Sequence, residues 1–229
     1  MEFIIISIIS IILAVILKYL FEYNIRKIKK IAENKELDEI SKKYPSNIEI
    51  CKEYLKKLNN QDVKIEENKD TEASLYIAVT NKISIANISK SYTRIQTIAH
   101  ECLHSIQDRK LLIFNFVFTN IYLIYFIIIS ILAILKILPF KLMFLTILLL
   151  LGLVYYSVRV FLENDAMIKA RYLAKEYMEE KKISDDEEIN KIVKGFDYIN
   201  NIGIECVNYN LFFGVIVKVL IFSIICIVR

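Results

Sequence analysis

Four long apolar runs constrain the fold of this chain more than any other feature of its sequence. A helix needs about 20 apolar residues to cross the hydrocarbon core of a bilayer. The runs have close to that length: Phe3–Phe21, Leu111–Leu135, Ile137–Phe161 and Leu211–Val228. Hydrophobic residues make up 55% of the 229 residues, yet 24% are charged, so the two kinds occupy separate stretches. This separation predicts a multi-pass membrane protein and excludes a disordered chain, a disulfide scaffold and a simple soluble enzyme.

The first run is expected to remain as a transmembrane anchor. A cleaved signal peptide is the alternative, but no basic residues precede the run and no small-residue cleavage site follows it. The fourth run carries Lys218 in its interior, which costs about 2.5–3.5 kcal/mol on insertion scales. The surrounding Ile, Val, Leu and Phe residues are expected to outweigh that cost. Asn115, Asn120 and Lys218 could serve transport, but hydrogen bonds between helices are the preferred interpretation for the asparagines, and a snorkelling or buried cation for Lys218.

The chain therefore divides into five predicted parts. They are an N-terminal transmembrane anchor (1–21), a polar region (22–110), a transmembrane hairpin (111–161), a second polar region (162–210) and a C-terminal transmembrane helix (211–229). A basic cluster follows the first run, at Arg26, Lys27, Lys29 and Lys30. By the positive-inside rule, this cluster predicts that both polar regions lie on the cytoplasmic side of the cell membrane. Lys136 and Lys141, in the turn of the hairpin, indicate the opposite orientation more weakly.

Charge and cysteine content narrow the range of partners. The net charge of +4 is too small to indicate a nucleic-acid partner, and the four apolar runs indicate the lipid bilayer as a partner. The four cysteines form no CxxC pair and are expected to be reduced; they are Cys51, Cys102, Cys206 and Cys226. The sequence indicates no oligomeric state.

The first polar region is expected to hold a short β-sheet between helices. A basic amphipathic stretch runs from Tyr23 to about Lys43, and Asn47 is the expected cap of a following helix. That helix would present one face and end at Asn59-Asn60; the face consists of Ile48, Cys51, Leu55 and Leu58. Strands are predicted at Val63–Ile65, Leu75–Val79 and Ile83–Ala86, the last two as a hairpin. From Ser91 the apolar spacing becomes helical.

The motif that carries chemistry is His100-Glu101-Cys102-Leu103-His104, an HExxH sequence on this predicted helix. A spacing of four places His100 and His104 on one face, so both imidazoles can bind a single zinc ion. Glu101 lies beside that face, where it can act as the general base toward a zinc-activated water. The chain has only two histidines, and both lie in the motif. Two solvated histidines are the alternative interpretation.

A catalytic zinc site needs a third protein ligand and an open position. No other histidine exists, and Cys102 lies about 160° around the helix from the two histidines. Glu163 and Asp165 follow the hairpin, where a second helix is expected to begin at Leu162. The hairpin leaves the bilayer near the point where it entered, so Glu163 is the preferred third ligand and Asp165 the alternative. Without the motif, both would be interpreted as solvated acids at a helix N-terminus.

The sequence resembles the YugP-like family of bacterial membrane-bound neutral zinc metallopeptidases, a gluzincin-type family. The resemblance rests on the anchor, on Ile98-Ala99-His100-Glu101-Cys102-Leu103-His104-Ser105-Ile106-Gln107 and on Leu162-Glu163-Asn164-Asp165-Ala166. The chain departs from the family pattern at Leu103, where glycine is usual, and at Met167 and Lys169. The resemblance implies that His100, His104 and Glu163 bind one Zn²⁺ and that Glu101 is the catalytic base. The implied fold is a mainly α membrane protein with a small α+β zincin-like cytoplasmic catalytic region.

The predicted function is a membrane-bound zinc metalloprotease that hydrolyses peptide bonds at the membrane surface. The alternative is a non-catalytic scaffold or transport-accessory protein that retains a metal site. Strand Ile83–Ala86, if exposed, could pair with an extended substrate. Gln96 and Gln107 are expected to be solvated helix residues, with orientation of the site as the alternative. The unranked candidates for an oxyanion stabiliser are Arg171, Tyr198 and Tyr209.

Overall fold

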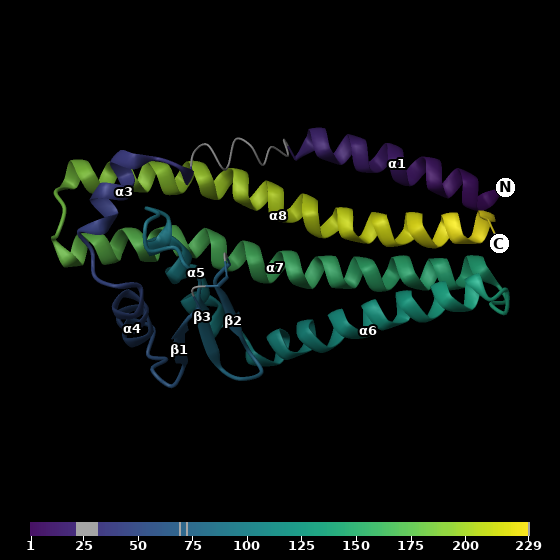
Figure 1. Ribbon diagram of the computed structural model, residues 1–229, viewed down its shortest axis with the longest axis horizontal. Coiled ribbons are helices and arrows are strands. Elements are labelled where there is room, and N and C mark those ends of the chain that lie inside the picture. The colour runs from purple at the N-terminus through teal and green to yellow at the C-terminus, as the bar shows by residue number, and fades with distance from the viewer. Residues whose placement is uncertain (22–31, 69, 72, 229) are drawn as a thin grey trace. The chain divides into compact units, whose positions relative to one another are not determined.

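The computed structural model describes residues 1–21, 32–68, 70–71 and 73–228 (Figure 1). The basic cluster at residues 26–30 and most of the amphipathic stretch from Tyr23 lie outside these residues. The chain forms two compact units, Met1–Tyr23 with Ile113–Phe161 and Glu205–Arg229, and Asn24–Leu112 with Leu162–Ile204. We call them the membrane unit and the polar unit, and each is described by itself.

Four helices in the described part of the chain are long and apolar enough to cross a membrane. They are α1 (Glu2–Leu20), α6 (Arg109–Ile134), α7 (Lys141–Lys181) and α8 (Asp186–Val228). In α7 and α8 only part of each helix belongs to the membrane unit. Within that unit, apolar side chains of α6, α7 and α8 form one cluster, and Phe3 and Ile6 of α1 pack against it. The prediction of four apolar helices of spanning length is therefore confirmed.

Asn120 bonds differently from the prediction, whereas Lys218 is a partly buried cation. The Asn120 amide donates to the Phe116 carbonyl, and the Lys218 ammonium donates to the Gly214 carbonyl. Each bond lies within a single helix. The predicted hydrogen bond between helices is therefore wrong for Asn120. The Lys218 ammonium also lies 5.1 Å from the ring centroid of Tyr122 in α6. A cation over an aromatic face offsets part of the cost of its burial.

Two short helices and a sheet begin the polar unit. They are α3 (Lys35–Lys42) and α4 (Asn47–Lys57), followed by β1 (Lys64–Glu67), β2 (Leu75–Ile77) and β3 (Lys82–Ile85). Ser46 caps α4 in a capping box with Glu49, so the predicted cap at Asn47 is wrong by one residue. Cys51 and Leu55 are buried as predicted, and Leu58 packs against the core while partly buried, whereas Ile50 and Tyr54 take the place of Ile48 on the buried face. This face of α4 is buried because it packs against α5 (Arg94–Ile106).

The sheet has the order β1-β3-β2, with β1 parallel and β2 antiparallel to β3. The predicted hairpin is confirmed, and Asn81 in its turn has a φ of 49°. Strand β3 is central and buried, with Ile83 and Ile85 in the core. The Ile83–Ala86 strand is therefore not exposed, and it cannot add a substrate strand because both of its edges are already paired.

Helix α7 corrects the predicted organisation of the second polar region. It is continuous over Lys141–Lys181. The second helix of the predicted hairpin therefore continues past Phe161, and no new helix begins at Leu162. Glu163 and Asp165 thus lie inside a helix, which removes their interpretation as acids at a helix N-terminus. The C-terminal part of α7 and the N-terminal part of α8 run side by side in the polar unit (Figure 1), joined at residues 182–185. Asp185 accepts a hydrogen bond from the Glu188 N–H and so caps the start of α8.

Candidate metal centre

Helix α5 carries the HExxH motif, and its position is determined by a buried arginine at its first turn. Arg94 is 3% exposed, and its guanidinium donates five hydrogen bonds to the segment that joins α3 to α4. The acceptors are Ser41 Oγ, Pro45 O, Asn47 Oδ1, Ser41 O and Tyr44 O, at 2.8–3.1 Å. A guanidinium has five N–H donors, so Arg94 is fully satisfied without a carboxylate.

The opposite side of α5 packs on α4 through two cysteines. Cys51 Sγ and Cys102 Sγ lie 3.6 Å apart, and both side chains are fully buried. Burial raises the pKa of the Cys102 thiol well above its usual range. All four cysteines are free thiols, as predicted. Cys102 therefore faces α4 and packs as a small neutral side chain.

Three side chains meet on the remaining face of α5. His100 Nε2 and His104 Nε2 are 3.0 Å apart, and each lies 3.5 Å from Glu163 Oε2 of α7. Two ligands about 2.0–2.1 Å from a tetrahedral zinc ion lie about 3.3 Å from each other. The three observed separations of 3.0, 3.5 and 3.5 Å bracket this value. His100, His104 and Glu163 thus fit a metal ion with one ligand atom each.

The electrostatics of this cluster favour a cation. Burial by itself lowers the pKa of His104, but the hydrogen bond and negative charge of Glu163 outweigh burial and raise it above its usual value. The carboxylate therefore attracts positive charge to the point where the two imidazoles meet. A proton can supply that charge, and so can a metal ion that takes the same lone pairs.

Glu101 lies beside the cluster and is 6% exposed. Burial raises the pKa of its carboxyl, while His100, His104 and a hydrogen bond from the backbone N–H of Tyr76 act in the opposite direction. Tyr76 belongs to β2, which is an edge strand of the sheet and contacts α5. A carboxyl with a raised pKa is a better proton acceptor near neutral pH than an ordinary glutamate.

Gln107 contacts this centre, contrary to the prediction that it is solvated. It follows the last residue of α5 in an extended conformation and lies 2.8 Å from His104 Nδ1 through its Oε1 atom. Its Nε2 donates to Leu162 O and to Asp165 Oδ2 in α7. Asp165, the alternative third ligand, is thus engaged by Gln107 and also by Lys169. The HxxQ spacing of the motif was the available signal for Gln107.

The remaining predicted site residues have other contacts. Gln96 is 7% exposed and donates to Asn200 Oδ1, so its predicted solvation is wrong. Arg171 donates to Asp197 Oδ1 and to the Tyr172 hydroxyl, which engages its guanidinium within the α7–α8 pair. Tyr209 belongs to the membrane unit, where its ring stacks on Phe213.

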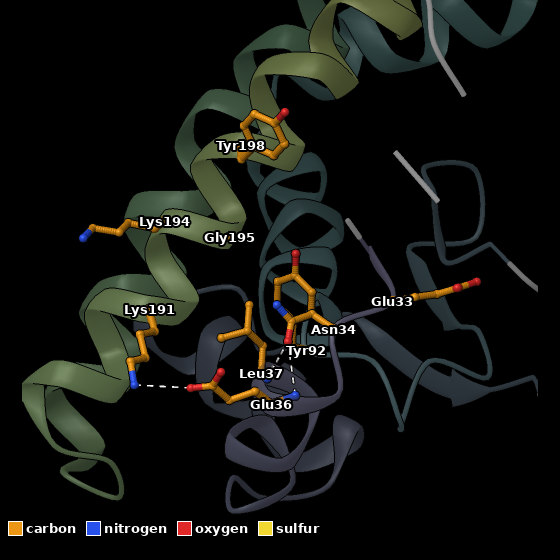
Figure 2. Close-up of a pocket in the computed structure, with 9 residues that line it drawn as sticks. All are labelled: Glu33, Asn34, Glu36, Leu37, Tyr92, Lys191, Lys194, Gly195 and Tyr198. Carbon is orange, nitrogen blue, oxygen red and sulfur yellow. Dashed lines mark hydrogen bonds and ion pairs between the residues drawn. The ribbon is translucent and has the colours of Figure 1, made fainter. Parts of the chain in front are cut away.

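Tyr198, the third oxyanion candidate, lines a pocket of about 520 Å³ between α3 and α8 (Figure 2). Neither histidine of the motif is among the lining residues, and the Lys191 ammonium there is paired with Glu36 and Glu187. Figure 2 shows the Lys194 side chain pointing away from Tyr92. Glu33 and Glu36 also line the pocket, so its two carboxylates and two ammonium groups give no charge of one sign with which to select a ligand.

No family model matches this sequence, and no curated protein or solved structure matches it either. The geometry of His100, His104 and Glu163 therefore stands as the observation on which a functional argument can be built.

Proposed function

We propose that this protein is a membrane-bound zinc metalloprotease that hydrolyses peptide bonds of protein or peptide substrates at the membrane surface. The observation that carries the proposal is the triangle of His100 Nε2, His104 Nε2 and Glu163 Oε2, whose edges of 3.0–3.5 Å suit three ligands of one zinc ion. Two imidazoles and one carboxylate form a ligand set of catalytic zinc sites, which leave a fourth position open.

The residues of the centre have distinct proposed roles. His100, His104 and Glu163 hold the ion. When bound, zinc activates a water molecule for attack on a peptide carbonyl. Glu101 takes the proton of that water and passes it to the amine that leaves. Its raised pKa, caused first by burial, suits a group that must accept and then release a proton.

Strand β2 is the proposed guide for the substrate in place of β3. It is an edge strand, and the hydrogen bond from the Tyr76 N–H to Glu101 brings that strand beside the proposed base. Leu75 is 43% exposed, so a substrate can approach the strand there. An extended peptide that pairs with an edge strand gains main-chain hydrogen bonds independently of its sequence.

The location at the membrane surface is proposed from chain connectivity. His104 precedes the start of α6 by only five residues, and α6 is one of the helices apolar enough to span. Helix α5 ends at Ile106 and α6 begins at Arg109. The two are separate helices with a two-residue connection. This short connection, and the position of Glu163 within α7, another helix apolar enough to span, support cleavage of juxtamembrane or misfolded proteins.

Metal content and hydrolysis test the proposal together. The full chain is purified in detergent, zinc per chain is measured, and cleavage of an unfolded protein substrate is followed. We expect about one zinc per chain in wild type, and loss of cleavage by about 10²–10⁴-fold in Glu101→Gln with zinc retained. Glu163→Gln should lose zinc, whereas Glu179→Gln on the same helix should lose neither zinc nor activity.

Two outcomes contradict the proposal in different ways. Stoichiometric zinc without cleavage of any of several substrates, in wild type as in Glu101→Gln, identifies a metal-holding scaffold instead of a protease. Absence of zinc from wild type, after purification without chelators and after incubation with zinc, removes both the ligand assignment and the mechanism.

A further inference from the structure

We propose that Gln107 is a positioning residue that fixes the tautomer of His104 and holds it against helix α7. This inference rests on the proposed function, since it gives a role to a residue behind the proposed metal ligand. It concerns the hydrogen-bond partner of the ligand and adds no residue to the ligand set.

The orientation of the Gln107 amide follows from the atoms around it. Its Nε2 lies 2.8 Å from Leu162 O and 3.1 Å from Asp165 Oδ2. A carbonyl oxygen and a carboxylate oxygen only accept hydrogen bonds, so the NH₂ group must face them. A flipped amide would place its oxygen against both acceptors. The Oε1 atom is therefore the one that faces His104.

The amide orientation determines where the His104 proton sits. Gln107 Oε1 lies 2.8 Å from His104 Nδ1 and can only accept, so Nδ1 must carry a hydrogen. A neutral imidazole has one N–H, which leaves a lone pair on Nε2. That lone pair is directed at the point shared by His100 Nε2 and Glu163 Oε2. Gln107 thus selects the tautomer that can bind a metal through Nε2.

The same amide joins the two elements that bear the ligands. His104 lies on α5, and Glu163 lies on α7, 59 residues later in the sequence. Gln107 contacts His104 and also contacts Leu162 and Asp165, the two residues that flank Glu163-Asn164. Gln107 can do so because its φ of −65° is helical, which keeps its side chain on the face of His104, three residues earlier, while the ψ of 160° turns only the following chain away from the helix. Partners of this kind typically change metal affinity by about 10–100-fold when they are removed.

Nitrogen NMR of the metal-free protein tests the tautomer directly. The chain has only two histidines, so protein labelled with ¹⁵N-histidine gives two imidazole patterns, and a His100→Gln variant assigns them. At a pH above the imidazole titrations, we expect His104 to carry its proton on Nδ1 in wild type. Gln107→Met, which keeps the length of the side chain but offers no acceptor, should shift His104 toward the Nε2–H tautomer.

Two further variants separate the possible causes of such a shift. Gln107→Glu keeps an acceptor for Nδ1–H but loses the donor to Leu162 O, so the tautomer should persist while the link to α7 is lost. Gln96→Ala is the matched control, because Gln96 is on the same helix and bonds to Asn200. It should leave the tautomer unchanged. Competition with a zinc chelator should show about 10–100-fold weaker binding in Gln107→Met.

The outcomes distinguish this inference from the proposed function. An unchanged His104 tautomer in folded Gln107→Met overturns the positioning role even if wild type binds zinc and cleaves protein. A shifted tautomer in Gln107→Met, retained in Gln107→Glu, supports the role even if wild type proves inactive. A tautomer that shifts equally in Gln96→Ala overturns it, since the effect would then come from any loosening of α5.

Discussion

At the scale of single residues, the centre depends on side chains that touch no ligand atom. Arg94 shows this best, since it lies six residues before His100 and holds the start of α5 through five hydrogen bonds. Three of its acceptors are backbone carbonyls of the segment between α3 and α4. Removal of the guanidinium would leave the Tyr44 and Pro45 carbonyls without this donor, at about 1–3 kcal/mol for each group, whereas Ser41 O would keep the Tyr44 N–H.

Arg94→Lys should therefore destabilise the polar unit although it preserves the charge. Lysine offers three donors from one nitrogen and cannot reach five acceptors spread around a planar fork. We expect a loss of about 3 kcal/mol or more in unfolding free energy, measured by thermal or denaturant unfolding in detergent. Arg109→Lys is the matched control, because Arg109 is exposed at the start of α6; it should change stability by no more than about 0.5 kcal/mol. Equal effects of the two substitutions would show that the Arg94 network contributes nothing specific.

At the scale of elements, the packing of α8 in the polar unit requires a residue without a side chain at Gly195. A Cβ atom there would meet Tyr92 Cε2 at 2.9 Å and Leu37 Cδ1 at 3.0 Å. Figure 2 shows Gly195 beside both side chains. The Tyr92 ring is fully buried and stacks on Phe196 with a centroid separation of 6.0 Å, so movement away from an added Cβ would disturb this stacking.

Gly195→Ala should destabilise the protein by a net amount of up to about 2 kcal/mol. The gain in helix propensity is about 1 kcal/mol, but insertion of a methyl group into a packed contact costs about 1–3 kcal/mol. Gly203→Ala is the matched substitution on the same helix, because its Cβ would meet only the flexible end of Met167. We expect it to be neutral or stabilising in the same unfolding assay. A stable Gly195→Ala variant would mean that Tyr92 and Leu37 can give way.

At the scale of the whole molecule, the proposed zinc ion would join two segments that the hairpin separates. His104 and Glu163 are 59 residues apart in sequence but share one centre in the polar unit. An ion that binds the folded state alone stabilises it by about 2.7 kcal/mol at a free concentration 100 times its Kd. Zinc should raise the thermal midpoint of wild type, and a chelator should reverse the rise.

The same zinc-induced stabilisation should depend on the ligands and not on the base. Glu163→Gln and His104→Ala should show little or no rise in midpoint, whereas Glu101→Gln should respond like wild type. A rise of equal size in the ligand variants would indicate that zinc binds elsewhere, for example at exposed carboxylates.

The transmembrane arrangement makes a second prediction at this scale. An even number of crossings between the polar regions predicts that both lie on one side, and the positive-inside rule predicts that this side is the cytoplasm. Cysteines introduced by Glu67→Cys and Lys182→Cys should react with a membrane-impermeant maleimide only after cells are permeabilised. Lys136→Cys, in the turn between α6 and α7, should react in intact cells. Labelling of wild type, which has four free cysteines, gives the background signal. A reversed labelling pattern would place both polar regions on the outer side of the membrane.

Local spacing in the sequence was sufficient to predict several features of the structure. The apolar runs predicted four spanning helices, alternating residues predicted the hairpin, and HExxH placed His100 and His104 one turn apart. These features depend on residues a few positions away, and such patterns repeat with the period of the helix or strand. The predicted meeting of Glu163 with the histidines rested on connectivity, and the structure brings the three side chains together.

Contacts between distant segments decided the rest. Pairing on both edges made β3 a central strand, and the packing of α5 on α4 buried Cys102 against Cys51. The continuity of α7 through Leu162 and the contact of Gln107 with that helix have no local pattern. A side chain at a helix end can face solvent or a neighbouring helix. The position of that neighbouring helix determines which of the two it contacts. The sequence alone thus determined which residues can bind a metal, while the tertiary structure decided how their lone pairs are oriented.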